Sequence, residues 1–237
     1  MKLFKTSLFA LTILAGTIST FAQTADEIIQ KHLTAAGGRD SWKKVNSIRM
    51  EGKMNANGME IEVVKTVLNK KGMRQDITLM GMTGYMILTP NEGWSFMPFG
   101  GGQTKAEPLT ADQVKEMQDE LDVYNELVDY KENGSKVDYI GKDDIEGTEV
   151  YKIKLVNKGG KEKTMFIDCK NYYLIREAEK VKADGKEMEM AVDFSNFKKQ
   201  DIGIVFPMTV GTPQGEVTFS KLDINTTIDE SIFKPAN

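Results

Sequence analysis

The sequence predicts a mainly β protein with a few helices, and two observations carry this prediction. From residue 47 onward, apolar and polar side chains alternate with the period of two that strands have, and turn residues recur at intervals of roughly 8–12 residues. Two capping boxes, at Thr24 and Thr110, open helical patterns before and within this series. No linker rich in proline, glycine or serine divides residues 23–237, so we expect a single domain there.

The first 22 residues have the pattern of a secretory signal peptide. Lys2 and Lys5 precede an apolar run at residues 8–16, which is too short to span a bilayer. Thr20 and Ala22 supply the small residues that signal peptidase requires, so we expect cleavage after Ala22. No cysteine follows the run for lipid attachment, and we expect a secreted, soluble mature chain.

The two helical patterns differ in length. The helix opened by Thr24 ends at Gly37-Gly38. The second capping box leads into an apolar stripe at spacings of three and four, which predicts one helix of about 20 residues, with a bend near Asp122 left open. The stripe consists of Val114, Met117, Leu121, Tyr124 and Val128. It fits either an ordinary helix packed on a sheet or a movable cover over the concave face of a curved sheet.

The remaining segments predict a meander of about ten to eleven short strands. Asn57-Gly58 is a strong hairpin signal in its first half, and residues 183–186 form a further turn in its second half. Within residues 149–157, Tyr151, Ile153 and Leu155 alternate with Lys152 and Lys154. That pattern is typical of a strand with one buried and one solvated face.

The composition excludes several functions. The chain has 31 basic and 35 acidic residues and a net charge of −4, so it lacks the charge of a nucleic-acid binder. One cysteine, Cys169, and one histidine, His32, exclude a disulfide framework and multi-ligand zinc sites. No nucleophile elbow or phosphate loop is present. We therefore predict no enzymatic activity, no metal and no cofactor, with His32 at the edge of a helix's apolar side.

Methionine is unusually frequent, with 14 residues in the chain. Most lie on the expected strands, and several pairs, such as Met188 and Met190, share a strand face. Methionine is flexible and polarizable and recurs on surfaces that accept varied apolar partners. Two interpretations stay open, an adaptable lining for an apolar ligand or ordinary core packing.

Several segments together resemble a known family. Ala25-Asp-Glu-Ile-Ile-Gln-Lys-His-Leu33 and residues 42–52 resemble the mature start of Bacteroidetes-type outer-membrane lipoprotein-sorting proteins. Thr89-Pro-Asn-Glu-Gly-Trp-Ser-Phe-Met-Pro98 is similar to a hairpin of the LolA/LolB-like periplasmic lipoprotein carriers, and residues 229–233 resemble their C-terminal ending. The carriers' lid-latching arginine is not matched, because residues 68–71 read Leu-Asn-Lys-Lys.

The resemblance implies an unclosed antiparallel β-barrel with an N-terminal helix and a mid-chain helix over its concave face. It also implies a soluble, monomeric periplasmic carrier that binds lipoprotein acyl chains, or a similar lipid, for transfer from an inner-membrane donor to an outer-membrane acceptor. The expected lining residues are Trp94, Phe96, Met97, Met117, Leu121, Met188, Met190 and Phe194. The alternatives are a lipid- or lipoprotein-sensing regulatory protein and a non-catalytic envelope protein with a filled core.

Overall fold

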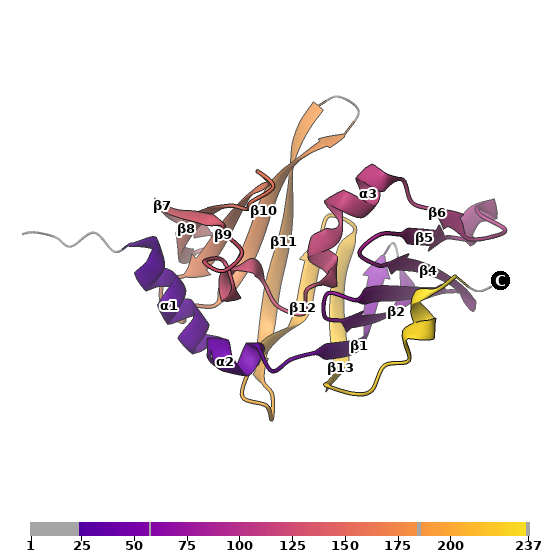
Figure 1. The fold of residues 1–237 in the computed structure, drawn as a ribbon, viewed down its shortest axis with the longest axis horizontal. Coiled ribbons are helices and arrows are strands. Elements are labelled where there is room, and N and C mark those ends of the chain that lie inside the picture. Colours follow the sequence, from indigo (N-terminus) through magenta and orange to yellow (C-terminus); the bar gives the residue numbers. More distant parts are fainter. Residues whose placement is uncertain (1–23, 57, 184–185, 236–237) are drawn as a thin grey trace, which may run out of the picture.

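The structure is a computed structural model that describes residues 24–56, 58–183 and 186–235. In this part of the chain, thirteen strands form one antiparallel sheet that curves without closing into a barrel (Figure 1). The expected fold class is confirmed, although the strands outnumber those expected. The signal peptide, its cleavage site, Asn57 of the first hairpin and Asp184-Gly185 lie outside the described residues.

The sheet joins two halves through the pairing of β1 with β13. Its order is β6-β5-β4-β3-β2-β1-β13-β12-β11-β10-β9-β8-β7. The first half comprises β1 (Ser47–Ala56), β2 (Met59–Leu68), β3 (Gly72–Leu79), β4 (Met82–Leu88), β5 (Gly93–Phe96) and β6 (Glu107–Pro108). The second half comprises β7 (Lys136–Ile145), β8 (Thr148–Val156), β9 (Glu162–Asp168), β10 (Leu174–Ala183), β11 (Lys186–Lys199), β12 (Val205–Thr212) and β13 (Gly215–Ile224).

The N-terminal helix α1 (Ala25–Ala35) begins at the predicted capping box. The Thr24 side chain accepts from the backbone of Glu27, and the Glu27 carboxylate accepts from the backbone of Thr24. Ile28 and Ile29 are fully buried in the main core cluster, together with side chains of β8 and β9. The short helix α2 (Arg39–Trp42) follows, and both helices flank the second half of the sheet in Figure 1.

The predicted single helix of about 20 residues, from the capping box at Thr110 through Val128, is wrong. The segment instead forms α3 (Ala111–Glu116) and two 3-10 helices, η2 (Gln118–Leu121) and η3 (Glu126–Val128). Asp122 is extended, and the Leu121 carbonyl accepts from the backbone of Lys70, which takes the place of a helical hydrogen bond. Asn125 then caps η3 by accepting from the backbone of Leu127. We call residues 111–128 the cover, because Val114, Leu121 and Leu127 reach the main core from this segment.

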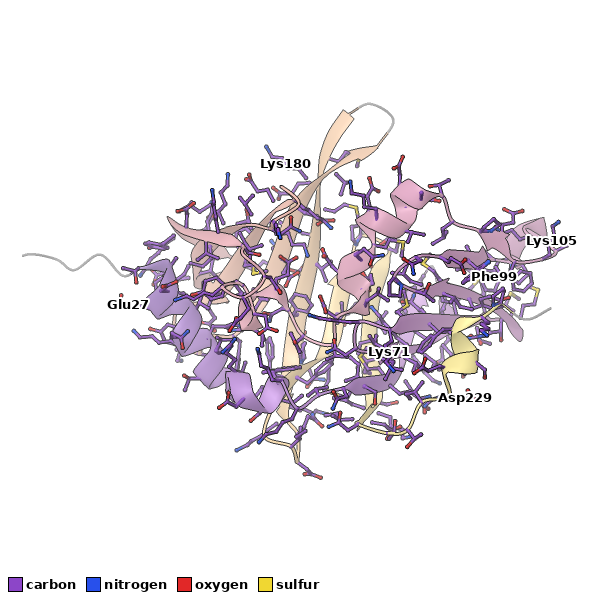
Figure 2. All side chains as sticks on the ribbon, in the orientation of Figure 1. Glu27, Lys71, Phe99, Lys105, Lys180 and Asp229 are labelled. Atoms are coloured by element: carbon purple, nitrogen blue, oxygen red, sulfur yellow. The ribbon has the colours of Figure 1, made fainter. Side chains whose placement is uncertain are left out.

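A shorter segment closes the convex side. The 3-10 helix η4 (Glu230–Phe233) lies beside β3, and the Phe233 ring packs where an ideal Cβ on Gly72 would be only 2.5 Å from it. Figure 2 shows Lys71, in the turn between β2 and β3, near Asp229, and the Lys71 ammonium pairs with Glu230 at 2.8 Å. A further 3-10 turn, η1 (Phe99–Gly101), follows β5.

Candidate functional site: a methionine-rich concave face

The strand register defines the concave face of the sheet. Directly opposed residues of an antiparallel pair point to the same side, so the face can be followed from strand to strand. Met50 opposes Lys65 on β2 and Leu222 on β13, and it belongs to the buried cluster that also contains α1 and cover side chains. Phe194 opposes Val210, which extends the same face to β11 and β12.

Methionines concentrate on this concave face. Following the register places ten of them there: Met50, Met54, Met59, Met73, Met82, Met86, Met165, Met188, Met190 and Met208. Such a face can adapt its shape to apolar partners, because each methionine has several rotatable bonds and a polarizable sulfur.

Five of these methionines form a partly exposed group at one end of the strands. We call Met54, Met59, Met82, Met188 and Met190 the methionine surface. Met59, Met82 and Met188 are 41%, 45% and 55% exposed, and none of the five belongs to the buried cluster. They lie near the hairpins that join β1 to β2, β3 to β4 and β10 to β11. The concave face is therefore buried at one end and accessible at the other.

The expected lining residues divide between the two faces. Trp94 and Phe96 oppose Ile87 and Tyr85 and pack with Phe233 in a second, convex cluster. This placement corrects the expectation for Trp94 and Phe96, because alternation along β5 turns both aromatic rings away from the cover.

The other six expected lining residues are associated with the concave side. Phe194 and Met117 pack on the main core, and Leu121 is buried in it. Met188 and Met190 belong to the methionine surface. The Met97 sulfur lies 3.1 Å from an ideal Cβ on Gly84, which opposes Ile77 on the concave side.

Charged side chains cross the concave face beneath the cover. The Glu120 carboxylate pairs with Lys65 on β2, and the neighbouring Asp119 pairs with Lys163 on β9 at 2.7 Å. Lys163 also pairs with Glu126 of η3 at 2.7 Å. We call η2 with its bound Lys65 and Lys163 the charged crossbar. The alternation pattern of β2 and β9 did not predict the charged crossbar. A single lysine on an otherwise apolar strand face does not show which acidic residue pairs with it.

The pKa values of the ionisable groups in this region depend on both their burial and the charges beside them. Burial opposes the charge on Lys163, but the carboxylates of Glu126 and Asp119 raise its pKa above the usual value. Burial likewise opposes ionisation of Asp119, yet its hydrogen bond and charge interaction with Lys163 lower its pKa overall. Glu177 lies on the neighbouring strand β10, and burial raises its pKa to about 7. The positive charge of Lys163 opposes this rise, whereas the negative charges of Glu126, Asp119 and Glu179 add to it.

The segment at 68–71, where the resembled carriers have their latching arginine, touches the cover through other groups. The backbone N–H of Lys70 donates to the Leu121 carbonyl at 2.8 Å. The Asn69 side chain accepts from the backbone of Val123 at 3.4 Å. The cover is thus fastened to the turn between β2 and β3 without an arginine.

His32 and the groove beside it lie away from the methionine surface. His32 is buried, donates from Nδ1 to the Tyr172 carbonyl at 2.9 Å, and has its pKa lowered to about 4 by burial. An open groove of about 390 Å³ lies between α1 and Tyr172, at the opposite end of the strands. Cys169 is half-buried nearby.

Membrane-spanning helices and metal-binding groups of side chains are both absent from the described residues. None of the helices in the described ranges has the length and apolar character needed to cross a membrane. Within the same ranges, no group of three or more histidine, cysteine or acidic side chains is arranged to hold a metal ion.

Comparison with known proteins identifies the fold. No protein-family model and no curated protein matches the sequence. Among solved structures, a LolA superfamily protein from Nitrosomonas europaea matches with a TM-score of 0.53 and 12% identity, over 90% of this chain and 98% of that one. A DUF1329 family protein from Desulfovibrio piger matches with a TM-score of 0.51 and 12% identity, over 87% of this chain and 97% of that one. The chain has the LolA-like fold.

Proposed function

We propose that the protein is a soluble periplasmic carrier that binds lipoprotein acyl chains, or a similar lipid, on the methionine surface and transfers them toward the outer membrane. The observation that carries this proposal is the accessible methionine surface on the concave side of the sheet, which the cover adjoins. The LolA-like fold and the motifs that resemble lipoprotein-sorting proteins support the same assignment. The signal-peptide pattern at residues 1–22 supports delivery to the periplasm.

Binding of an acyl chain requires no chemistry from the protein. Each methylene transferred from water to an apolar surface contributes about 0.8 kcal/mol, so a 16-carbon chain gains on the order of 12 kcal/mol when fully buried. A partly exposed methionine surface supplies part of that burial. Movement of the cover would complete it, because the cover adjoins the same face.

Analysis of co-purified lipid tests the binding claim. Denaturing extraction of the purified mature protein, followed by mass spectrometry, should release lipid or lipopeptide. The protein should also bind an apolar fluorescent probe that added lipid displaces. A protein that is repeatedly empty and binds no probe would contradict the proposal and favour an envelope protein with a filled core.

Two matched variants locate the binding surface. Met82→Glu places a charge on the methionine surface, whereas Met80→Glu places the same charge in the adjoining β3–β4 turn, where Met80 is 82% exposed. We expect Met82→Glu to weaken probe binding at least tenfold and Met80→Glu to leave it unchanged, with both variants folded. Release of labelled lipoproteins from spheroplasts by the wild-type protein then separates a carrier from a sensor.

A further inference from the structure

The charged crossbar connects the two halves of the sheet. Asp119 and Glu120 are neighbours in η2, yet their lysine partners lie on β9 and β2, which five strands separate in the sheet order. Lys161, beside β9, also pairs with Asp119 at 3.2 Å and with Glu179 of β10 at 3.0 Å. The crossbar therefore lies across the concave face from one half to the other.

Exposure of the concave face changes at the level of the crossbar. On β1, Met54 is partly exposed, whereas Met50, which directly opposes Lys65, is only 5% exposed. On β13, Val217 is partly exposed and Phe219 is buried. Along β1, and from Val217 to Phe219 on β13, the more accessible apolar residues thus lie on the hairpin side of the crossbar. Beyond it, Leu222 and Ile224 of β13 are still partly exposed.

Charged side chains form an unfavourable boundary for an apolar chain. A methylene group that displaced the partners of Lys163 would leave buried charges unpaired, which is strongly unfavourable. The penalty at Lys65 is smaller, because its partner Glu120 is 44% exposed. The side chains of Lys163 and Glu126 are only 11% and 15% exposed, so water compensates little for lost pairing. Contact with the methionine surface makes binding of an acyl chain more favourable, whereas contact with these ion pairs makes it less favourable.

We propose that the charged crossbar determines the acyl-chain length that the protein accepts, with Lys65, Glu120 and Lys163 as the specificity-determining residues. This inference rests on the proposed function. The methionine surface binds the chain from the hairpin end, and the crossbar ends the apolar site. Methylenes beyond that length remain in water and add no affinity.

Binding of a fatty-acid series tests the inference. Dissociation constants are measured by probe displacement for even-numbered fatty acids from octanoate to stearate. For wild-type protein we expect affinity to rise about fourfold per methylene, as expected from about 0.8 kcal/mol each, and then to level off. The double variant Lys65→Met, Glu120→Leu replaces one end of the crossbar with apolar side chains. Its affinity should continue to rise by about fifteenfold for at least one further two-carbon step.

A matched control and three outcomes decide between the possibilities. Lys53→Met with Glu60→Leu removes an exposed pair of the same residue types from β1 and β2 and should leave the length profile unchanged. Circular dichroism confirms that each variant is folded, and a second variant, Lys65→Gln, applies if the double variant unfolds. Identical profiles for wild type and the crossbar variants, or a wild-type profile that never levels off, would overturn the inference. A wild-type protein that binds no fatty acid, lipid or lipopeptide contradicts the proposed function itself.

Discussion

The ammonium nitrogen of Lys163 lies 2.7 Å from a carboxylate oxygen of Glu126, so this lysine of β9 joins the end of the cover to the sheet. The same nitrogen is also 2.7 Å from Asp119. Two 3-10 helices of the cover therefore share one positive charge. Removal of that charge should destabilise the cover more than the loss of an exposed surface ion pair would.

Lys163→Met should destabilise the protein by on the order of 3 kcal/mol, because Glu126 loses its ion-pair partner in a largely buried position and Asp119 keeps only Lys161. Urea unfolding measures this change in free energy of unfolding, and hydrogen exchange should show faster exchange in the cover. Lys71→Met is the matched control, since Lys71 and Glu230 are both more than half exposed and should contribute no more than about 0.5 kcal/mol. Equal losses in the two variants would contradict this role of Lys163.

His32 should make the fold less stable in acid. Its pKa is lowered from 6.5 to about 4 by burial, so the unfolded chain binds the extra proton between these values. The contribution of neutral His32 is complete above pH 6.5 and is lost as the pH falls toward 4, by about 3 kcal/mol. His32→Asn should remove this part of the pH dependence in unfolding experiments, and an unchanged slope would contradict it.

Glu177 should make the fold less stable as the pH rises, the opposite pH dependence to that of His32. Its pKa is raised from 4.5 to about 7, so the folded state favours the protonated acid. This contribution is complete below pH 4.5 and is lost as the pH rises to 7. Glu177→Gln should therefore gain on the order of 1 to 2 kcal/mol at pH 8, a value reduced for the partial exposure of the side chain. A loss of stability at pH 8 would exclude this assignment.

Gly72 should be required for the packing of the C-terminal segment. A Cβ at this position would lie 2.5 Å from the Phe233 ring, so Gly72→Ala should cost about 1–3 kcal/mol. In a Phe233→Ala background the same substitution should cost much less, because the space is then vacant. A double-mutant cycle of unfolding free energies measures the coupling, and additive effects would show that the contact is unimportant.

Local patterns in the sequence predicted the elements that local interactions determine. Thr24 and Thr110 cap helices as expected, because each box satisfies its hydrogen bonds within four residues. The helix predicted across Asp122 failed, since the Leu121 carbonyl bonds to Lys70, about fifty residues away in the chain. Helix propensity and hydrophobic periodicity describe local sequence only, so they cannot predict a hydrogen bond from a residue so far away in the chain.

The candidate site was predictable only in part. The parity of Met188 and Met190 indicated a shared methionine face, and the register extends it over both halves of the sheet. Parity alone did not tell which face of β5 meets the cover, so Trp94 and Phe96 were assigned to the wrong side. The pairing of Asp119 and Glu120 with lysines on separate strands depends on sheet curvature, which the sequence pattern does not encode.

The most direct test of the account is methyl NMR of protein labelled at the methionine methyl groups, titrated with a fatty acid or lipopeptide. We expect ligand-dependent shifts for Met54, Met59, Met82, Met188 and Met190, with the buried Met73 and Met165 changing little. Saturable shifts confined to the methionine surface would support acyl-chain binding on the concave face. An absence of shifts at all five methionines, with any acyl ligand at concentrations below micelle formation, would contradict it.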